Sequence, residues 1–187
     1  MNMLIRFFIM MALLKQQLKH TQSSTTESAA SPSQSIQLNH EQLFSPISRS
    51  YRVLPHDMGW RDHLPNYRYL SFIELNITKW IVECCHHKGI PNLFWIISMQ
   101  EMVYLKEVRF LEKLTVKSQL EGWDKKYLYF QHHFFVNNSL MAIGMTKFML
   151  KTKKELKLPQ ILVNEDSHPS AVIDTWNAHQ TAIKSQN

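Results

Sequence analysis

The stretch NYRYLSFIELNITKWIVECCHHKG, residues 66–89, decides the fold of this chain. Its apolar side chains recur every three or four residues, which is the spacing of one helix face; they are Leu70, Ile73, Ile77, Trp80, Ile81, Cys84 and Cys85. Gly89 follows the last of them, and glycine is common just after the end of a helix. The sequence therefore predicts one long helix with an unusually apolar face.

The segments around this helix have the pattern of β-strands. SRSYRVLP (48–55) predicts a first strand that a proline closes. After the helix, aromatic, β-branched or alternating apolar residues predict four more strands, in 92–106, 113–120, 126–136 and 139–151. This order predicts an α+β domain in which a curved antiparallel sheet wraps the helix.

Turn and terminal signals complete this prediction. EGWDKK (121–126) is expected to form one turn, and Asn137 and Asn138 separate the last two strands. A short C-terminal helix is expected between residues 169 and 183, with Ile173, Trp176 and Ile183 near one face.

The chain divides into three parts by composition. Its 187 residues suffice for one domain with a tail, and we expect the domain at 43–187. Residues 21–42 are expected to be a linker, because Ser and Thr dominate from Thr21 to Ser35 and large apolar side chains are nearly absent.

Residues 1–20 form a short hydrophobic N-terminal segment. Its apolar run from Phe7 to Leu14 is far below the roughly 18 to 20 residues that span a bilayer. No acidic residue precedes Glu27. Three interpretations stay open, namely a weak amphipathic membrane anchor, a targeting segment, or an over-extended start with later methionines as alternative first residues.

Charge and cysteine content limit the class of partner and compartment. The net charge of +6 suits an acidic partner, but the basic residues are dispersed, so we expect no nucleic acid. Cys84 and Cys85 are adjacent within the predicted helix and are expected to be buried free thiols. They suit a reducing compartment and argue against disulfides and a zinc site. We expect a cytoplasmic protein, with membrane association through residues 1–20 as a second option.

The stretch PHDMGWRDHLPNYRYLSFIEL, residues 55–75, resembles the entry to the central helix of hotdog-fold acyl-CoA thioesterases of the 4-hydroxybenzoyl-CoA thioesterase type. That branch has a pattern close to DxDxxxHxNNxxY with an arginine before the tyrosine, and five positions are in register: Asp57, His63, Asn66, Arg68 and Tyr69. LEGWDKKYLYFQHHF (120–134) and the Trp176 helix are also similar to features of this branch. The resemblance covers roughly residues 48–180 and implies the hotdog fold.

Three positions depart from the family pattern. The second aspartate, the usual catalytic carboxylate of the family, corresponds to Gly59, the first of the paired asparagines to Pro65, and the small residue before the histidine to Asp62.

The resemblance implies hydrolysis of an acyl-CoA thioester, which needs a group that activates water or attacks the carbonyl and donors for the developing oxyanion. Amides around Leu64, Asn66 and Tyr67 at the helix start are candidate donors. Asn66 can add its side-chain amide or cap the helix. His63 can orient the loop or a water, or act structurally.

Three carboxylates are candidates for the catalytic acid. Asp57 can replace the missing aspartate or hydrogen-bond its own loop backbone. Asp62 can pair with His63. Glu74 lies about two turns into the helix and can face the site, solvent or a dimer partner.

Coenzyme A carries phosphates, and Arg61 and Arg68 are candidate contacts for them. We expect no cofactor and no metal. The resemblance implies a homodimer, or a higher homo-oligomer, with active sites at the subunit boundary. The leading hypothesis is an acyl-CoA thioesterase, and the alternative is a non-catalytic acyl-CoA-binding or structural hotdog protein, because Gly59 occupies the usual aspartate position. A nucleic-acid or membrane-surface binder is a third and weaker alternative, suggested by charge alone.

Overall fold

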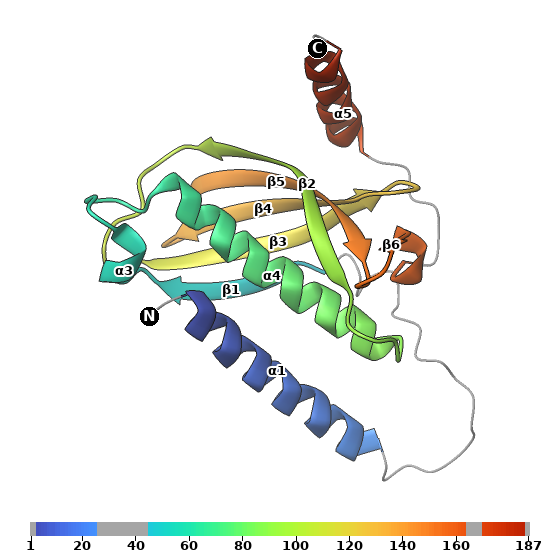
Figure 1. Cartoon of the computed structure of the whole chain (residues 1–187). Helices are drawn as coiled ribbons and strands as arrows, with labels where there is room; N and C mark the ends of the chain where they lie inside the picture. Colours follow the sequence, from blue (N-terminus) through green and yellow to red (C-terminus); the bar gives the residue numbers. More distant parts are fainter. Residues whose placement is uncertain (1–2, 26–44, 164–169, 186–187) are drawn as a thin grey trace.

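The structure is a computed structural model that describes residues 3–25, 45–163 and 170–185. Its body is one antiparallel sheet with strand order β1-β3-β4-β5-β2, and β6 pairs with β5. The strands are β1 Ile47–Arg52, β2 Phe94–Tyr104, β3 Lys113–Trp123, β4 Leu128–Val136, β5 Ser139–Lys151 and β6 Leu156–Lys157. The sheet curls around the long helix α4, Asn66–His87 (Figure 1). The predicted α+β architecture is confirmed.

The remaining helices are short or peripheral. They are α1 Met3–Thr25, α3 Pro55–Met58, the 3₁₀ helix η1 Pro159–Ile161 and α5 Ala171–Lys184. Helix α4 ends as the sequence predicts, with Lys88 as the C-cap and Gly89 at a φ of 63°. Glycine adopts this left-handed conformation without the steric cost that a Cβ brings.

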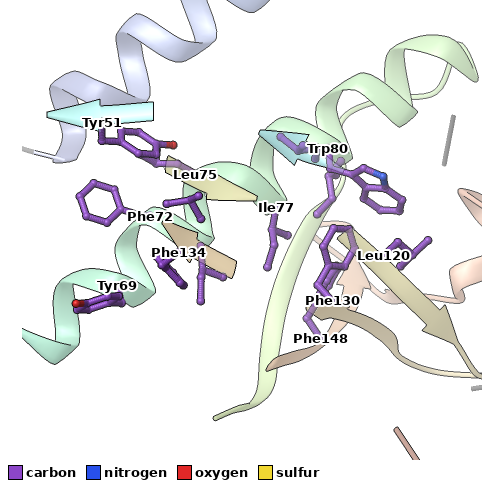
Figure 2. Packing of buried hydrophobic residues seen from close by; sticks show 14 of the residues in the cluster. Tyr51, Tyr69, Phe72, Leu75, Ile77, Trp80, Leu120, Phe130, Phe134 and Phe148 are labelled. Atoms are coloured by element: carbon purple, nitrogen blue, oxygen red, sulfur yellow. The ribbon is translucent and has the colours of Figure 1, made fainter. Parts of the chain in front are cut away.

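Alternation along the strands separates an inner sheet face from an outer one. On β4 the fully buried Phe130 and Phe134 face α4. Figure 2 shows Trp80 of α4 beside Phe130, and their ring centroids are 5.1 Å apart. Helix and sheet approach closely at Gly144, where an added Cβ would lie 2.7 Å from Met102 Sδ. A side chain at this position would collide with the ends of the Met102 side chain and, at 3.1 Å, of the Ile73 side chain of α4, so both would have to move.

One polar layer crosses this apolar core. Asn76 of α4 donates from Nδ2 to Ser118 Oγ at 2.9 Å, and the ring of His132 lies between Ser118 Oγ at 2.8 Å and Thr146 Oγ1 at 3.2 Å. All four side chains are fully buried. Burial lowers the pKa of His132 to about 3, so its ring is neutral at physiological pH.

One detail of the predicted elements was wrong. The expected turn at residues 121–126 begins later, because β3 continues through a bulge to the buried Trp123. The turn follows, where Asp124 Oδ1 accepts hydrogen bonds from the backbone N–H groups of Lys126 and Tyr127, both at 2.7 Å. The expected C-terminal helix is present as α5, in which Ile173 and Trp176 are buried and Ile183 is 48% exposed.

Helix α5 packs on the outer face of the sheet. Ile173 and Trp176 contact Tyr129, which points away from α4 because it alternates with Phe130 on β4. Lys147 Nζ of β5 donates to Asn177 Oδ1 at 2.7 Å. The two faces of the sheet are thus covered by different helices, α4 inside and α5 outside.

Helix α1 packs against α4 and the core (Figure 1). Met10 and Leu14 are each only 2% exposed, and Arg6 is buried beside them. The helix continues to Thr25, into the segment whose composition predicts a linker, and the rest of that linker, residues 26–42, lies outside the described part of the chain. No helix among the described residues is long and apolar enough to cross a membrane.

Candidate active site

A cavity of about 210 Å³ lies at the start of α4. Its walls come from the loop before α4, the first turn of α4, and the end of β2 with the residues after it. The lining residues are His63, Leu64, Asn66, Tyr69, Tyr104, Leu105, Lys106 and Glu107. The helix begins after Pro65, which is the N-cap and makes no side-chain cap hydrogen bond. The cavity is thus bordered by an uncapped helix N-terminus.

Backbone donors at this N-terminus are fewer than the sequence predicts. The N–H of Leu64 donates to Val108 O at 2.8 Å, so it already has a partner. Asn66 and Tyr67 are the first two helical residues, whose N–H groups have no acceptor one turn earlier in the helix. Asn66 is exposed and lines the cavity, but it is not the N-cap. The helix dipole adds positive potential at this point.

His63 is held by acidic neighbours at the cavity wall. Its Nδ1 lies 2.9 Å from Asp62 Oδ1 and 3.9 Å from Glu107 Oε1. The hydrogen bond with His63 lowers the pKa of Asp62, whose carboxylate is 94% exposed. A carboxylate on Nδ1 favours the tautomer that carries its proton there, which leaves Nε2 able to accept a proton. Asp62 and His63 therefore form a pair that can act as an oriented base.

Asp57 lies away from this cavity. Its Oδ2 accepts a hydrogen bond of 2.7 Å from Arg6 Nη2 of α1 and one of 3.0 Å from the N–H of Leu54. Its side chain is fully buried, and Arg68 Nε lies 3.5 Å from its Oδ1. Of the two interpretations of Asp57, the structure fits a carboxylate that hydrogen-bonds its own loop backbone. Arg6 is an additional partner that the sequence did not predict.

Gly59 stands where the family pattern has its second aspartate. Its φ of 62° and ψ of −125° form a backbone conformation that side chains disfavour. The nearest atom to a Cβ built there is Tyr67 Oη at 3.7 Å, so space alone does not exclude a side chain. This position thus lacks the carboxylate of the family pattern, and its backbone conformation is one that suits glycine.

Glu74 lies on an exposed side of α4 and does not line the cavity. Partial desolvation by the surrounding protein raises the pKa of its carboxyl. The structure thus brings His63, Asp62 and Asn66 together and leaves Asp57 and Glu74 outside the group.

The two predicted phosphate contacts differ in their surroundings. Arg61 is exposed, and its guanidinium lies 4.9 Å from the ring centroid of Trp60. Arg68 Nη2 instead donates to His56 O at 2.8 Å, and its side chain is only 15% exposed. Arg68 therefore supports the loop from inside, and a contact between Arg68 and a phosphate stays a prediction.

Several cavity residues were missed from the sequence. Tyr104 is one of them, and its ring centroid lies 5.2 Å from that of Tyr69, a position that the family pattern had included. Burial raises the pKa of Tyr69 to about 12. Lys106 and Glu107 follow β2 directly. An isolated antiparallel bridge between His63 and Arg109 brings this segment to the loop before α4. The only sequence signal was the cluster of polar residues after the predicted strand.

The described residues contain no group of three or more His, Cys, Asp or Glu side chains placed to bind a metal ion. Cys84 and Cys85 are free and buried, and burial raises the pKa of both thiols. A neutral, buried thiol is a poor nucleophile and a poor metal ligand.

The chain is similar in sequence to known thioesterases. The sequence profile of the Thioesterase-like superfamily matches residues 53–162. The probable thioesterase YBR096W of Saccharomyces cerevisiae is 25% identical over 139 residues, which are 67% of this chain and 56% of the yeast protein. The chain thus spans little more than half the length of this relative.

Two solved structures have the same fold. A probable thioesterase from Bartonella henselae has a TM-score of 0.54 at 13% identity, with 61% of this chain and 98% of that chain covered. A gentisyl-coenzyme A thioesterase has a TM-score of 0.56 at 14% identity, with 64% and 100% covered. Helix, curled sheet and loop together define a hotdog fold.

The chain belongs to the thioesterase-like superfamily. The family and these relatives support thioester hydrolysis as the general class of activity.

Proposed function

We propose that the protein hydrolyses an acyl-CoA thioester, with His63 as the base that activates water. One observation carries this proposal: His63 lines the cavity at the uncapped start of α4 while Asp62 holds its Nδ1 at 2.9 Å. Water activation and oxyanion stabilisation, the two requirements of the reaction, then have candidates at one small cavity.

The reaction follows from these positions. His63 Nε2 takes a proton from water as the water oxygen attacks the thioester carbonyl. The Asn66 and Tyr67 amides donate to the oxygen on which negative charge develops, and the helix dipole favours that charge. Collapse of the tetrahedral intermediate breaks the carbon–sulfur bond, and the thiolate of coenzyme A takes the proton from His63.

Coenzyme A as the leaving group has two lines of support. The gentisyl-coenzyme A thioesterase that shares the fold is named for a CoA thioester. A basic hollow of about 380 Å³ has a lining that includes Lys113, Lys117 and Phe135. Lys106, at the cavity, donates to Ser139 Oγ at 2.8 Å, and Ser139 directly follows the hollow's Asn137 and Asn138. Phosphates and an adenine ring suit such lysines and such an aromatic side chain.

A homodimer is part of this proposal. Strand β2 is a sheet edge, and several of its side chains are exposed and apolar, which an edge-to-edge partner would cover. They are Phe94, Ile96, Val103 and Tyr104, each 40–52% exposed. Tyr104 also lines the cavity, so a partner at this edge would lie beside the site.

The test is release of free thiol from a panel of acyl-CoAs by the full chain, with a His63→Ala variant. We expect turnover of at least one acyl-CoA and a kcat lowered by about 10² to 10³ in the variant. Glu74→Gln is the control, because Glu74 lies outside the cavity. Unchanged kcat in His63→Ala, with folding intact, would refute the role of His63.

The alternative function is acyl-CoA binding without hydrolysis, and Gly59 at the usual aspartate position favours it. Calorimetry with the same acyl-CoAs separates the two functions. Binding without thiol release from any acyl-CoA would establish the alternative. Thiol release that depends on His63 would exclude it.

A further inference from the structure

Helix α1 has two apolar faces, and only one is covered. The inner face, with Met10 and Leu14, packs on the core and on α4. The outer face bears a stripe of large side chains that are 45–61% exposed, namely Leu4, Ile5, Phe8, Ile9 and Leu13. Surface helices of soluble proteins usually place polar residues on the face opposite the core.

This outer stripe is continuous along the helix. The stripe consists of two adjacent rows with a spacing of four residues, one with Leu4 and Phe8 and the other with Ile5, Ile9 and Leu13. This spacing keeps the residues of a row on one side of an α-helix. Such a contiguous exposed stripe marks an interaction surface, whereas single exposed apolar side chains are ordinary.

The contacts of the inner face of α1 determine the direction in which the outer stripe points. Arg6 Nη2 donates to Asp57 Oδ2 at 2.7 Å and to Arg52 O at 3.1 Å. These contacts fix the first turns of α1 to the body of the domain, so the outer stripe points away from it. Turning the helix to bury the stripe would expose Met10 and Leu14 and break the buried pair.

Charge and aromatic side chains at the ends of the stripe identify the partner. Lys15 and Lys19 are exposed just beyond Leu13, and the sequence has no acid before Glu27. Near the other end of α1, on the same loop as Asp57, Trp60 is 89% exposed beneath the Arg61 guanidinium. Tryptophan and basic side chains are typical of protein segments at a membrane surface.

We propose that the outer face of α1 docks on an anionic phospholipid membrane, with the helix lying in the plane of the surface. Its apolar stripe enters the boundary between headgroups and acyl chains, while Lys15 and Lys19 meet the lipid phosphates. The inner face stays on the domain. This peripheral anchor is independent of the proposed catalysis.

A second copy of the chain is a poorer partner for this stripe. In a symmetric dimer through α1 the same patch meets itself. Lys15 and Lys19 would then approach a surface of α1 that offers no carboxylate, since the helix contains none. An anionic membrane supplies both the apolar layer and the negative charge.

The test is flotation of the full chain with vesicles of phosphatidylcholine containing about 30% phosphatidylserine. We expect binding, at least about tenfold weaker binding to pure phosphatidylcholine, and loss of binding in high salt. The double variant F8S/I9S should bind at least about tenfold more weakly. L156S/L158S is the matched control, because both leucines are more than half exposed far from α1 in the chain, and it should bind like the native protein.

Three results would overturn the proposal: no binding to either vesicle, equal binding by F8S/I9S and the native chain, or a dimer in light scattering that F8S/I9S abolishes while vesicle binding persists. The thermal unfolding midpoint of F8S/I9S serves as the folding check, since both side chains are mostly outside the core. Thioesterase activity on soluble acyl-CoA is expected to be unchanged in F8S/I9S, so failure of this proposal and failure of the proposed function are distinguishable.

Discussion

Arg6 of α1 and Asp57 of the loop before α4 form a buried ion pair, with Nη2 and Oδ2 at 2.7 Å across 51 positions of sequence. Both side chains are nearly or fully shielded from water. The pair fastens the N-terminal helix to the loop that leads into the candidate site. It also explains why Asp57 is not available to a substrate.

Replacing Arg6 tests how strongly this pair holds the helix. Arg6→Met leaves the buried Asp57 carboxylate without its closest cation, although Arg68 Nε remains at 3.5 Å. We expect a loss of about 3 kcal/mol in the free energy of unfolding, at the lower end for a broken buried pair. Urea denaturation measures it. The matched control is Lys15→Met, an exposed position on the same helix, with a change below about 0.5 kcal/mol. Equal losses in both variants would contradict a stabilising pair.

Burial of His132 predicts acid sensitivity. The folded-state pKa of about 3 lies below the ordinary value of 6.5, so between these values the unfolded chain binds more protons. Stability is therefore full above pH 6.5 and falls as the pH is lowered through this window, by up to about 1.4 kcal/mol per pH unit. Urea denaturation from pH 7 to 4 should give a shallower slope for His132→Gln. The control is His133→Gln on the outer face, and an identical slope in all three proteins would refute this role.

The tight turn between β4 and β5 gives a prediction that tests local geometry. Asn137 and Asn138 have φ values of 48° and 64°, and Val136 pairs with Ser139 across the two-residue loop. Asparagine tolerates this left-handed region and valine does not. Asn138→Val should lower the free energy of unfolding by about 1 to 2 kcal/mol, while Asn138→Gly should cause no loss. Thermal unfolding measures both, and equal effects would contradict the argument.

Periodicity and turn residues were sufficient for most of the fold. The spacing in residues 66–89 predicts α4 and its end at Gly89, and alternation predicts the strands. The docking of α1 was not predicted, because nothing in an apolar segment indicates that its arginine pairs with an aspartate 51 residues later. The exposure of Ile183 was not predicted either, because periodicity gives a side of a helix but not how far the partner surface extends.

The site was predictable only in part, for a similar reason. His63, Asp62 and Asn66 lie close together in sequence, and their grouping follows from local structure. Tyr104 and Glu107 reach the cavity through pairing between distant segments, such as the bridge of His63 with Arg109. Sequence spacing carries no information on such contacts unless the whole topology is known. The contacts of Arg68 with His56 and Asp57 could not be predicted from the sequence for the same reason.

Dimerisation through β2 is testable at the exposed edge of this strand. Ile96 is 40% exposed on β2, and a lysine there would place a charge in an edge-to-edge contact. We expect the native chain to be a dimer and Ile96→Lys to be a monomer in size-exclusion chromatography with light scattering. Leu158→Lys, at a residue 62% exposed outside the sheet, should remain dimeric. A monomeric native chain, or an unaffected Ile96→Lys dimer, would contradict this interface.

The Asp62–His63 pair predicts a specific pattern in a double-mutant cycle. If Asp62 acts only by orienting His63, its removal matters only while His63 is present. Asp62→Ala should lower kcat less than His63→Ala does, because Asp62 is 94% exposed and Glu107 lies 3.9 Å from the same nitrogen. The double variant should be no slower than His63→Ala alone. Thiol release at saturating acyl-CoA measures all four kcat values. Additive losses would show that Asp62 acts on the substrate or water directly. If Asp62→Ala loses little, adding Glu107→Gln tests whether the second carboxylate replaces Asp62 beside His63.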